Sequence, residues 1–196
     1  MTERWPADPS HVSEAAQWLR QGAVIAFPTD TLYAVGARGG DPAAVRRLYQ
    51  VKRRPAGQPM VWLVTGRGQV EGSAIVSAAA DDLMRRFWPG PLTLVLPARE
   101  AAGGGTIAVR APDHAVALAL LAALGEPIAS SSANPAGQPP PVDADQVIAG
   151  LGDRLDFVLD GGPCRIGQPS TILDLSGATP RILRQGAIPA AGLGIG

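Results

Sequence analysis

The sequence contains very little cysteine, histidine or lysine. One cysteine, Cys164, permits neither an internal disulfide nor a cysteine-based metal site, and two histidines, His11 and His114, cannot form a zinc centre alone. The longest apolar run, at 115–125, is far shorter than the roughly twenty residues that cross a bilayer, and the N-terminus lacks the apolar core of a signal peptide. We therefore expect a soluble, cytoplasmic protein without a protein-bound metal and without membrane association.

The chain also lacks net charge. Its 17 basic residues balance 17 acidic ones, so no overall field attracts it to nucleic acid or to an anionic membrane. A length of 196 residues with 46% hydrophobic content is enough for one domain with a full core. We expect that domain to span residues 1–188, followed by a flexible tail at 189–196.

Helical and strand patterns alternate along the chain. Helices are predicted at 9–21, 42–51, 78–88, 113–124 and 144–151, and Asp-Pro pairs mark the first two starts as N-caps followed by proline. Strands are predicted at 23–28, 31–37, 59–64, 92–97, 106–112, 126–132, 157–162, 170–175 and 181–184. This alternation predicts an α/β protein of the α+β type, a twisted mixed sheet flanked by helices, with functional residues on loops at strand ends.

Two residue types occur once each, and both instances lie in polar loops. Lys52 is the only lysine beside sixteen arginines, and Asn134 is the only asparagine. Lys52, Arg53 and Arg54 follow a predicted helix, where cations can simply complement the helix C-terminus. They can equally form a phosphate clamp, because an ammonium and a guanidinium fork suit a triphosphate together. Composition leaves both interpretations open.

Other loops share this ambiguity. The sequence SSSAN at 130–134 suits a turn, but it also places hydroxyl and amide donors at the end of an apolar strand. Arg110 ends the apolar strand TIAVR, where it can form a surface ion pair or receive a carboxylate or phosphate. The residues alone therefore predict a concave anion site built from several loops, with no P-loop, GxSxG or HExxH motif.

Eight motifs in unbroken order resemble one family, the YrdC family of L-threonylcarbamoyladenylate synthases. The similarity spans roughly residues 10–188 and is closest to the short, single-domain members. The motifs are PTDTLYAVGA (28–37), VKRRP (51–55), FWPGPLTLVLP (87–97), VRAPDH (109–114), SSSANPAG (130–137), LDGGPC (159–164), PSTILDL (169–175) and ILRQG (182–186).

The resemblance implies a nucleotidyltransferase. L-threonine and bicarbonate would form a carbamate that attacks the α-phosphate of ATP, giving threonylcarbamoyl-AMP and pyrophosphate for tRNA modification. Mg²⁺ would be held mainly through the ATP phosphates. The implied partner is the tRNA threonylcarbamoyltransferase complex, in transient contact, and weak binding of tRNA or double-stranded RNA is conceivable for this family.

The resemblance also assigns site residues. Lys52 and Arg54 match the K-x-R motif and take the catalytic role. The ATP-binding positions are Lys52, Arg54, Thr106, Ser132, Asn134 and Arg184. The positions around threonine are Thr31, Tyr33, Arg110, Ser130 and Ser170.

Departures from the family pattern keep alternatives open. Leu63 stands where many members have histidine, Ala34 replaces a common glycine, and Pro140-Pro141-Val142 replaces a Ser-Pro-Thr element. One alternative is an RNA-binding module of the same fold without catalysis, which the neutral net charge disfavours. Another is a carbamoyl- or aminoacyl-adenylating paralogue, such as the similar domain of hydrogenase-maturation proteins, whose cysteine-rich zinc segments this sequence lacks.

Overall fold

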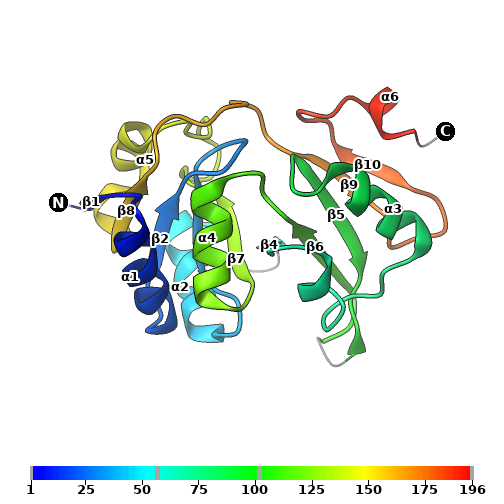
Figure 1. Cartoon of the computed structure of the whole chain (residues 1–196), viewed down its shortest axis with the longest axis horizontal. Coiled ribbons are helices and arrows are strands. Elements are labelled where there is room, and N and C mark those ends of the chain that lie inside the picture. The colour runs from blue at the N-terminus through cyan, green and yellow to red at the C-terminus, as the bar shows by residue number, and fades with distance from the viewer. Residues whose placement is uncertain (1, 56–57, 101–102, 195–196) are drawn as a thin grey trace.

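One mixed β-sheet runs through the molecule and carries helices on its faces (Figure 1). The computed structural model describes residues 2–55, 58–100 and 103–194, and within them ten strands follow the order β1-β8-β2-β3-β7-β4-β6-β5-β9-β10. The sheet is mixed, because it contains parallel pairs (β1 with β8, β5 with β9) as well as antiparallel pairs (β2 with β3, β3 with β7). The predicted fold class is thereby confirmed.

The first half of the sheet is covered on both faces. It comprises β1 (Glu3–Pro6), β8 (Phe157–Asp160), β2 (Val24–Phe27), β3 (Ala34–Arg38) and β7 (Ile128–Ser132). Helices α1 (Pro9–Arg20) and α4 (Ala115–Leu124) pack on one face, and α2 (Pro42–Lys52) and α5 (Ala144–Leu151) on the other. Successive side chains of β2 pack alternately against the α1/α4 layer and the α2/α5 layer, because neighbouring residues of a strand point to opposite faces of the sheet.

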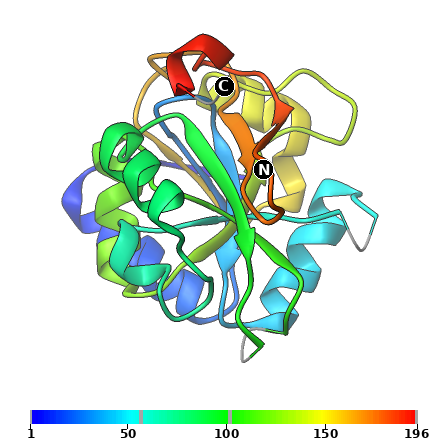
Figure 2. The same cartoon turned by 90° about the vertical axis from the view of Figure 1, so that its right-hand side faces the viewer.

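The second half of the sheet is covered on one face only. It comprises β4 (Val61–Leu63), β6 (Thr106–Arg110), β5 (Leu92–Pro97), β9 (Thr171–Asp174) and β10 (Arg181–Arg184). Helix α3 (Ala78–Phe87) packs against Leu92, Leu94 and Leu96. Figure 2 shows the C-terminal segment running beside β5 and ending in α6 (Ala190–Leu193). Two short 3₁₀ turns lie at Arg67–Gln69 and Gly152–Arg154.

The predicted helix starts are confirmed by their caps. The Asp8 carboxylate accepts a hydrogen bond from His11 N, and Asp41 accepts from Ala43 N and Ala44 N. Both helices then begin with proline, whose fixed φ suits the first turn and whose missing N–H is not needed there. None of the helices within the described ranges has the length and apolar character of a membrane span.

Three local predictions differ from the structure. Residues 31–33, expected in a strand, form a turn instead, because Thr29 Oγ1 accepts from Thr31 N and Leu32 N. Strand β1 was not predicted, since its only cue is pairing with distant β8. The tail expected to be flexible at 189–196 forms α6 over part of its length, with Leu193 fully buried, while 195–196 lie outside the described residues.

Leu193→Ala tests whether this tail belongs to the core. Leu193 is 0% exposed in the cluster that includes Leu83 and Leu92, so truncation should lower the free energy of unfolding. Buried leucine-to-alanine changes typically cost about 2–5 kcal/mol. Urea unfolding of Leu193→Ala and of a matched Leu183→Ala, whose side chain is 52% exposed, gives the comparison. Equal stability of the two variants would show that the tail detaches in solution.

A second prediction concerns acid. Both Arg47 terminal nitrogens donate to the Asp156 carboxylate, at 2.6 and 2.9 Å, and Val24 N donates at 2.7 Å. Burial alone would raise the pKa of Asp156, but these hydrogen bonds outweigh it and lower the pKa below its ordinary value. A carboxyl with a lowered folded-state pKa stabilises the fold above its unfolded pKa of about 3.9, and this stabilisation disappears as pH falls through the folded-state pKa.

Asp156→Asn should therefore be less stable than the parent by a constant amount above about pH 5, and the gap should shrink at lower pH. Urea unfolding at several pH values between about 3 and 7 measures it. Asp82→Asn is the control, because that exposed carboxylate pairs with Arg85 and Arg86 only at 3.4 Å. A stability gap for Asp156→Asn that does not change with pH would contradict the prediction.

Candidate active site

A pocket of about 380 Å³ lies where the two halves of the sheet meet. Its floor comes from the face of the second half that carries no helix, and its far wall comes from β7 and the turn before β3. The lining residues are Thr29, Thr31, Leu32, Tyr33, Ala34, Arg54, Pro59, Val61, Leu63, Thr93, Val95, Ala108, Arg110, Ser130, Ser131, Ser132, Pro140, Pro169, Ser170, Ile172, Leu183 and Arg184.

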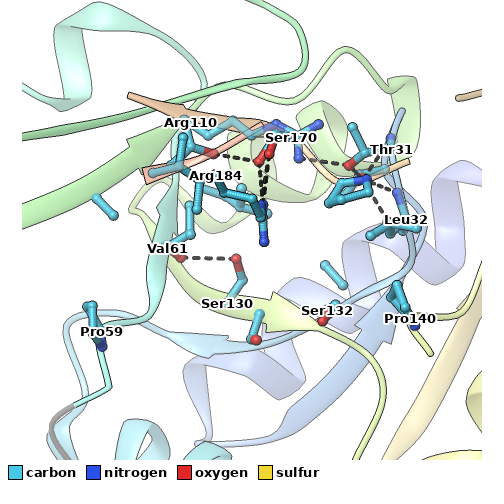
Figure 3. Close-up of a pocket in the computed structure, with 18 of the residues that line it drawn as sticks. Thr31, Leu32, Pro59, Val61, Arg110, Ser130, Ser132, Pro140, Ser170 and Arg184 are labelled. Atoms are coloured by element: carbon cyan, nitrogen blue, oxygen red, sulfur yellow. Dashed lines mark hydrogen bonds between the residues drawn. The ribbon is translucent and has the colours of Figure 1, made fainter. Parts of the chain in front are cut away.

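The pocket has two polar walls and a partly apolar floor. Figure 3 shows Arg110, Arg184 and Ser170 together on one side and Ser130 and Ser132 opposite them. The strand β5 explains the apolar floor: Leu92, Leu94 and Leu96 face α3, so the alternate residues Thr93 and Val95 face the pocket. Such a site can orient a polar ligand while excluding water from part of it.

Arg110 is held rigidly at the pocket wall. Its Nε donates to Gly90 O at 3.0 Å, one terminal nitrogen donates to Thr31 Oγ1 at 2.8 Å, and the other donates to Asp30 Oδ1. A guanidinium has five N–H bonds, so two are left for a ligand. The side chain is almost fully buried, and burial lowers the pKa of Arg110 although the adjacent Asp30 counteracts part of this effect.

Asp30 supports Arg110 from behind. It is fully buried, it is absent from the pocket lining, and its Oδ1 also accepts from Asp113 N at 3.2 Å. Its Oδ2 has no hydrogen-bond partner among the described residues. The pair is therefore charge-balanced, and a ligand meets only the guanidinium.

Arg184 forms a second anchored cation on the same side. Its Nε and one terminal nitrogen donate to Ser170 O, at 3.1 and 2.9 Å, and the same terminal nitrogen donates to Ser170 Oγ at 3.1 Å. Ser170 Oγ lies 2.8 Å from the buried Thr93 Oγ1. Gly186 makes this approach possible, because a Cβ there would lie 2.2 Å from Pro169 O.

Arg54 brings a third cation to the pocket from the loop after α2. One terminal nitrogen donates to Ser131 Oγ at 3.2 Å and the other to Pro59 O at 3.0 Å. Its Nε is buried without a partner among the described residues. An unpaired buried donor costs free energy, so a ligand that accepts from Arg54 would be favoured.

Most of the residues assigned from the sequence meet in this pocket, but not all. Thr31, Tyr33, Arg54, Arg110, Ser130, Ser132, Ser170 and Arg184 line it, whereas Lys52, Asn134 and Thr106 do not. Thr106 begins β6 and is exposed; it shares its strand face with Ala108 and Arg110, so it lies beyond the pocket edge.

Lys52 and Asn134 contact each other under the pocket wall. The Lys52 ammonium donates to Ser132 O and Asn134 O, and Asn134 Oδ1 lies 3.4 Å away. Lys52 is 2% exposed and Asn134 is buried. Both side chains therefore lie behind the pocket lining, where their polar groups are engaged with each other and with main chain.

Tyr33 has a core role that the sequence did not reveal. Its hydroxyl donates to Gly162 O at 2.9 Å and lies 3.2 Å from Asp160 Oδ1. Burial, followed by the charge of Asp160, raises the pKa of Tyr33. Tyr33 lines the pocket as expected, while its hydroxyl is engaged by Gly162 and Asp160.

Sequence reasoning missed Thr93 and the supporting role of Asp30. Thr93 had a usable signal, since it is a polar residue at an alternate position of the otherwise apolar strand LTLVLP. Asp30 lies in the polar sequence PTDT (28–31), but its pairing with Arg110 joins residues far apart in the chain. Within the described ranges, no three His, Cys, Asp or Glu side chains gather as metal ligands.

Comparison with known proteins identifies a family and several relatives that this chain resembles. A family model for Sua5, YciO and YrdC, described as "Telomere recombination", matches residues 17–186. The chain is 39% identical to threonylcarbamoyl-AMP synthase of Bacillus subtilis over 95% of its own length, and it spans 59% of that relative. It is 42% identical to a putative threonylcarbamoyl-AMP synthase of Mycobacterium tuberculosis, covering 96% of this chain and 92% of the relative.

A solved structure agrees with the sequence relatives. The crystal structure of Pyrococcus abyssi Sua5 complexed with L-threonine superposes with a TM-score of 0.90 at 39% identity. The match covers 96% of this chain and 58% of the Pyrococcus chain. The shared architecture therefore includes both halves of the sheet.

Proposed function

Because this chain belongs to the Sua5/YciO/YrdC family, we propose that it is an L-threonylcarbamoyladenylate synthase. The observation that carries this proposal is the set of three arginines, Arg54, Arg110 and Arg184, lining one pocket. No Asp or Glu occurs among the described residues of that lining, so the pocket is strongly suited to anions. A carboxylate, a carbonate and a triphosphate together need several cations of this kind.

We place L-threonine at the anchored end of the pocket. The two remaining N–H bonds of Arg110 can hold its carboxylate, and the hydroxyls of Thr31, Ser130 and Ser170 lie on the same lining for its polar groups. Leu63 adds an apolar surface where a side-chain methyl group can pack. The Pyrococcus relative, which is complexed with L-threonine, supports this choice.

The nucleotide would extend from this end toward Arg54. Arg184 has one terminal nitrogen without a protein hydrogen bond in the described structure, and Arg54 has the unpaired Nε, so both can receive phosphate oxygens. Ser132 lies on the wall opposite Arg184. Mg²⁺ needs no protein ligand set here, because ATP phosphates bind it and the family reaction brings it with the nucleotide.

The proposed reaction needs no protein nucleophile. Threonine nitrogen and bicarbonate give a carbamate and release water; a carbamate oxygen then bonds to the α-phosphorus of ATP, and the bond to the bridging oxygen breaks with loss of pyrophosphate. The arginines hold the reactants in line and stabilise the charge that develops on the leaving group. The absence of histidine from the described lining is consistent with such a mechanism.

The product also suggests a partner. An acyl-adenylate of this kind is an activated donor, so it should pass to a transferase that modifies tRNA, in the compartment where tRNA is modified. We propose the tRNA threonylcarbamoyltransferase complex as that acceptor, in transient contact. The zero net charge of the chain supports transfer of the small molecule over tight binding of the tRNA itself.

Pyrophosphate release tests the proposal directly. The purified chain is incubated with ATP, Mg²⁺ and bicarbonate and with each of several amino acids, and pyrophosphate is measured over time. We expect release that requires both threonine and bicarbonate, with serine and valine much less effective. Absence of threonine-dependent release would count against a synthase, and release with a different amino acid would indicate a paralogue of altered specificity.

A further inference from the structure

The lone lysine is enclosed on all sides by its own protein. Lys52 is the last residue of α2 and is 2% exposed. An ammonium group has three N–H bonds, and three acceptors lie around this one: Ser132 O, Asn134 O and, at 3.4 Å, Asn134 Oδ1. Its hydrogen-bonding capacity is therefore used within the chain.

These acceptors belong to the turn that follows β7. Ser132 ends β7 and lines the pocket, and Asn134 N donates to Ser132 O at 3.0 Å. The Asn134 side-chain amide closes the turn by donating to Pro135 O at 3.0 Å and to Gln138 O at 2.6 Å. The polar groups of the turn thus surround the Lys52 ammonium, which is supplied by α2.

The link between helix and turn runs in both directions. Ala136 N donates back to Lys52 O at 3.4 Å, so the end of α2 and the turn are joined through main chain as well as side chain. Two residues after Lys52, Arg54 donates to Ser131 Oγ. One short segment therefore sets both the position of the β7 hydroxyls and that of the Arg54 guanidinium.

We infer that Lys52 is a positioning residue that fixes the turn Ser132–Asn134, and that it acts on the bound nucleotide through that turn and not by contacting its phosphates. To reach a phosphate, the ammonium would have to leave three acceptors, two of them main-chain carbonyls in a buried turn. Ser132 O would keep Asn134 N as a donor, but Asn134 O would lose the ammonium, and leaving a buried carbonyl without its donor is unfavourable. Burial, with a smaller effect from Arg54, lowers the pKa of Lys52 to about 8, which agrees with an enclosed site.

The composition of the chain allows a direct test. Asn134 is the only asparagine and Lys52 the only lysine, so selective isotope labelling gives one side-chain signal for each. In protein labelled with ¹⁵N-asparagine, we expect Lys52→Met to shift the Asn134 side-chain amide and to speed its hydrogen exchange at least about tenfold, because the turn opens. The matched control Arg54→Met removes a cation two residues away and should leave this amide unchanged.

A second measurement needs no variant, in case Lys52→Met does not fold. In wild-type protein labelled with ¹³C-lysine, the Lys52 Cε resonance should titrate near pH 8, and it should do so equally when saturating pyrophosphate is bound. Direct contact with phosphate would instead raise the pKa of Lys52 toward or above its ordinary value of about 10.4. Such a rise, or an unchanged Asn134 amide in folded Lys52→Met, would overturn the inference.

Only the pyrophosphate measurement rests on the proposed synthase function. Calorimetry shows separately whether wild-type protein binds pyrophosphate. If it does not, the Asn134 amide alone supports or overturns the positioning role, while threonine-dependent pyrophosphate release decides the proposed function separately. The proposed synthase function and the positioning role of Lys52 can therefore be refuted independently of each other.

Discussion

Arg110→Ala should raise the threonine concentration needed for half-maximal pyrophosphate release about ten- to hundredfold, while the requirement for ATP changes little. The two free N–H bonds of Arg110 are the proposed receptor for the threonine carboxylate, and hydrogen bonds to charged groups are worth roughly 1.5–3 kcal/mol. Threonine and ATP affinities measured separately by calorimetry check the expectation. Loss of ATP binding with threonine binding intact would reverse the assignment of the pocket ends.

Arg110→Ala should also destabilise the fold, because it leaves Asp30 buried, charged and unpaired. Removing one partner of a buried ion pair typically costs about 3–5 kcal/mol. Arg110→Lys separates the two effects: it keeps a cation beside Asp30 but cannot offer a planar fork to a carboxylate. We expect Arg110→Lys to recover most of the stability and little of the threonine affinity. Recovery of both would show that charge alone is needed.

Lys52→Arg should lower pyrophosphate release at least tenfold at saturating ATP and threonine. Guanidinium is wider and planar, and a site with 2% exposure cannot admit it without moving Ser132 or Asn134. A displacement of about 1 Å in a positioned group can cost roughly a hundredfold in rate. The melting temperature should fall as well, since the new side chain overpacks a buried turn.

Arg53→Lys is the matched control for that experiment. Arg53 is the exposed neighbour of Lys52, and exchanging its head group disturbs no buried contact. We expect wild-type turnover and stability from this variant. Wild-type turnover in Lys52→Arg itself would mean that the lone lysine is an accident of composition and that the turn tolerates a different cation.

How much of the site the sequence predicts depends on how far apart in the chain the contacting residues lie. Arg110 was noticeable because a single cation ends an apolar strand, but only the family resemblance placed it in a pocket, which the structure shows it to line. Lys52 was correctly marked as unusual, but its contact was not predictable: its acceptors lie some eighty residues further along the chain. The local sequence pattern identifies residues that differ from their surroundings, and the fold determines which groups these residues contact.

The same distinction between local and long-range contacts explains where the predicted and the observed structure agree or differ. Helices with an Asp-Pro start were predicted closely because cap, proline and apolar period all lie within one segment. Tyr33 lines the pocket as expected, but the partner of its hydroxyl, Gly162 O, comes from a distant loop and had no cue in the local sequence. The C-terminal segment resembles a loose tail by composition, but Thr171 Oγ1, which accepts from Gly186 N and Ile188 N, fastens it to β9.

The pairing of β1 with β8 has a consequence for biosynthesis. Glu3 lies beside Phe157 and Pro6 beside Asp160, so the earliest strand finds its neighbour only after most of the chain has been translated. At about 5–20 residues per second, the ribosome needs roughly 8–30 s to supply that neighbour. During this interval Trp5 lacks Phe157, on which its ring later stacks at 3.9 Å. We therefore expect the Trp5 ring to stay exposed in the growing chain until Phe157 has been added.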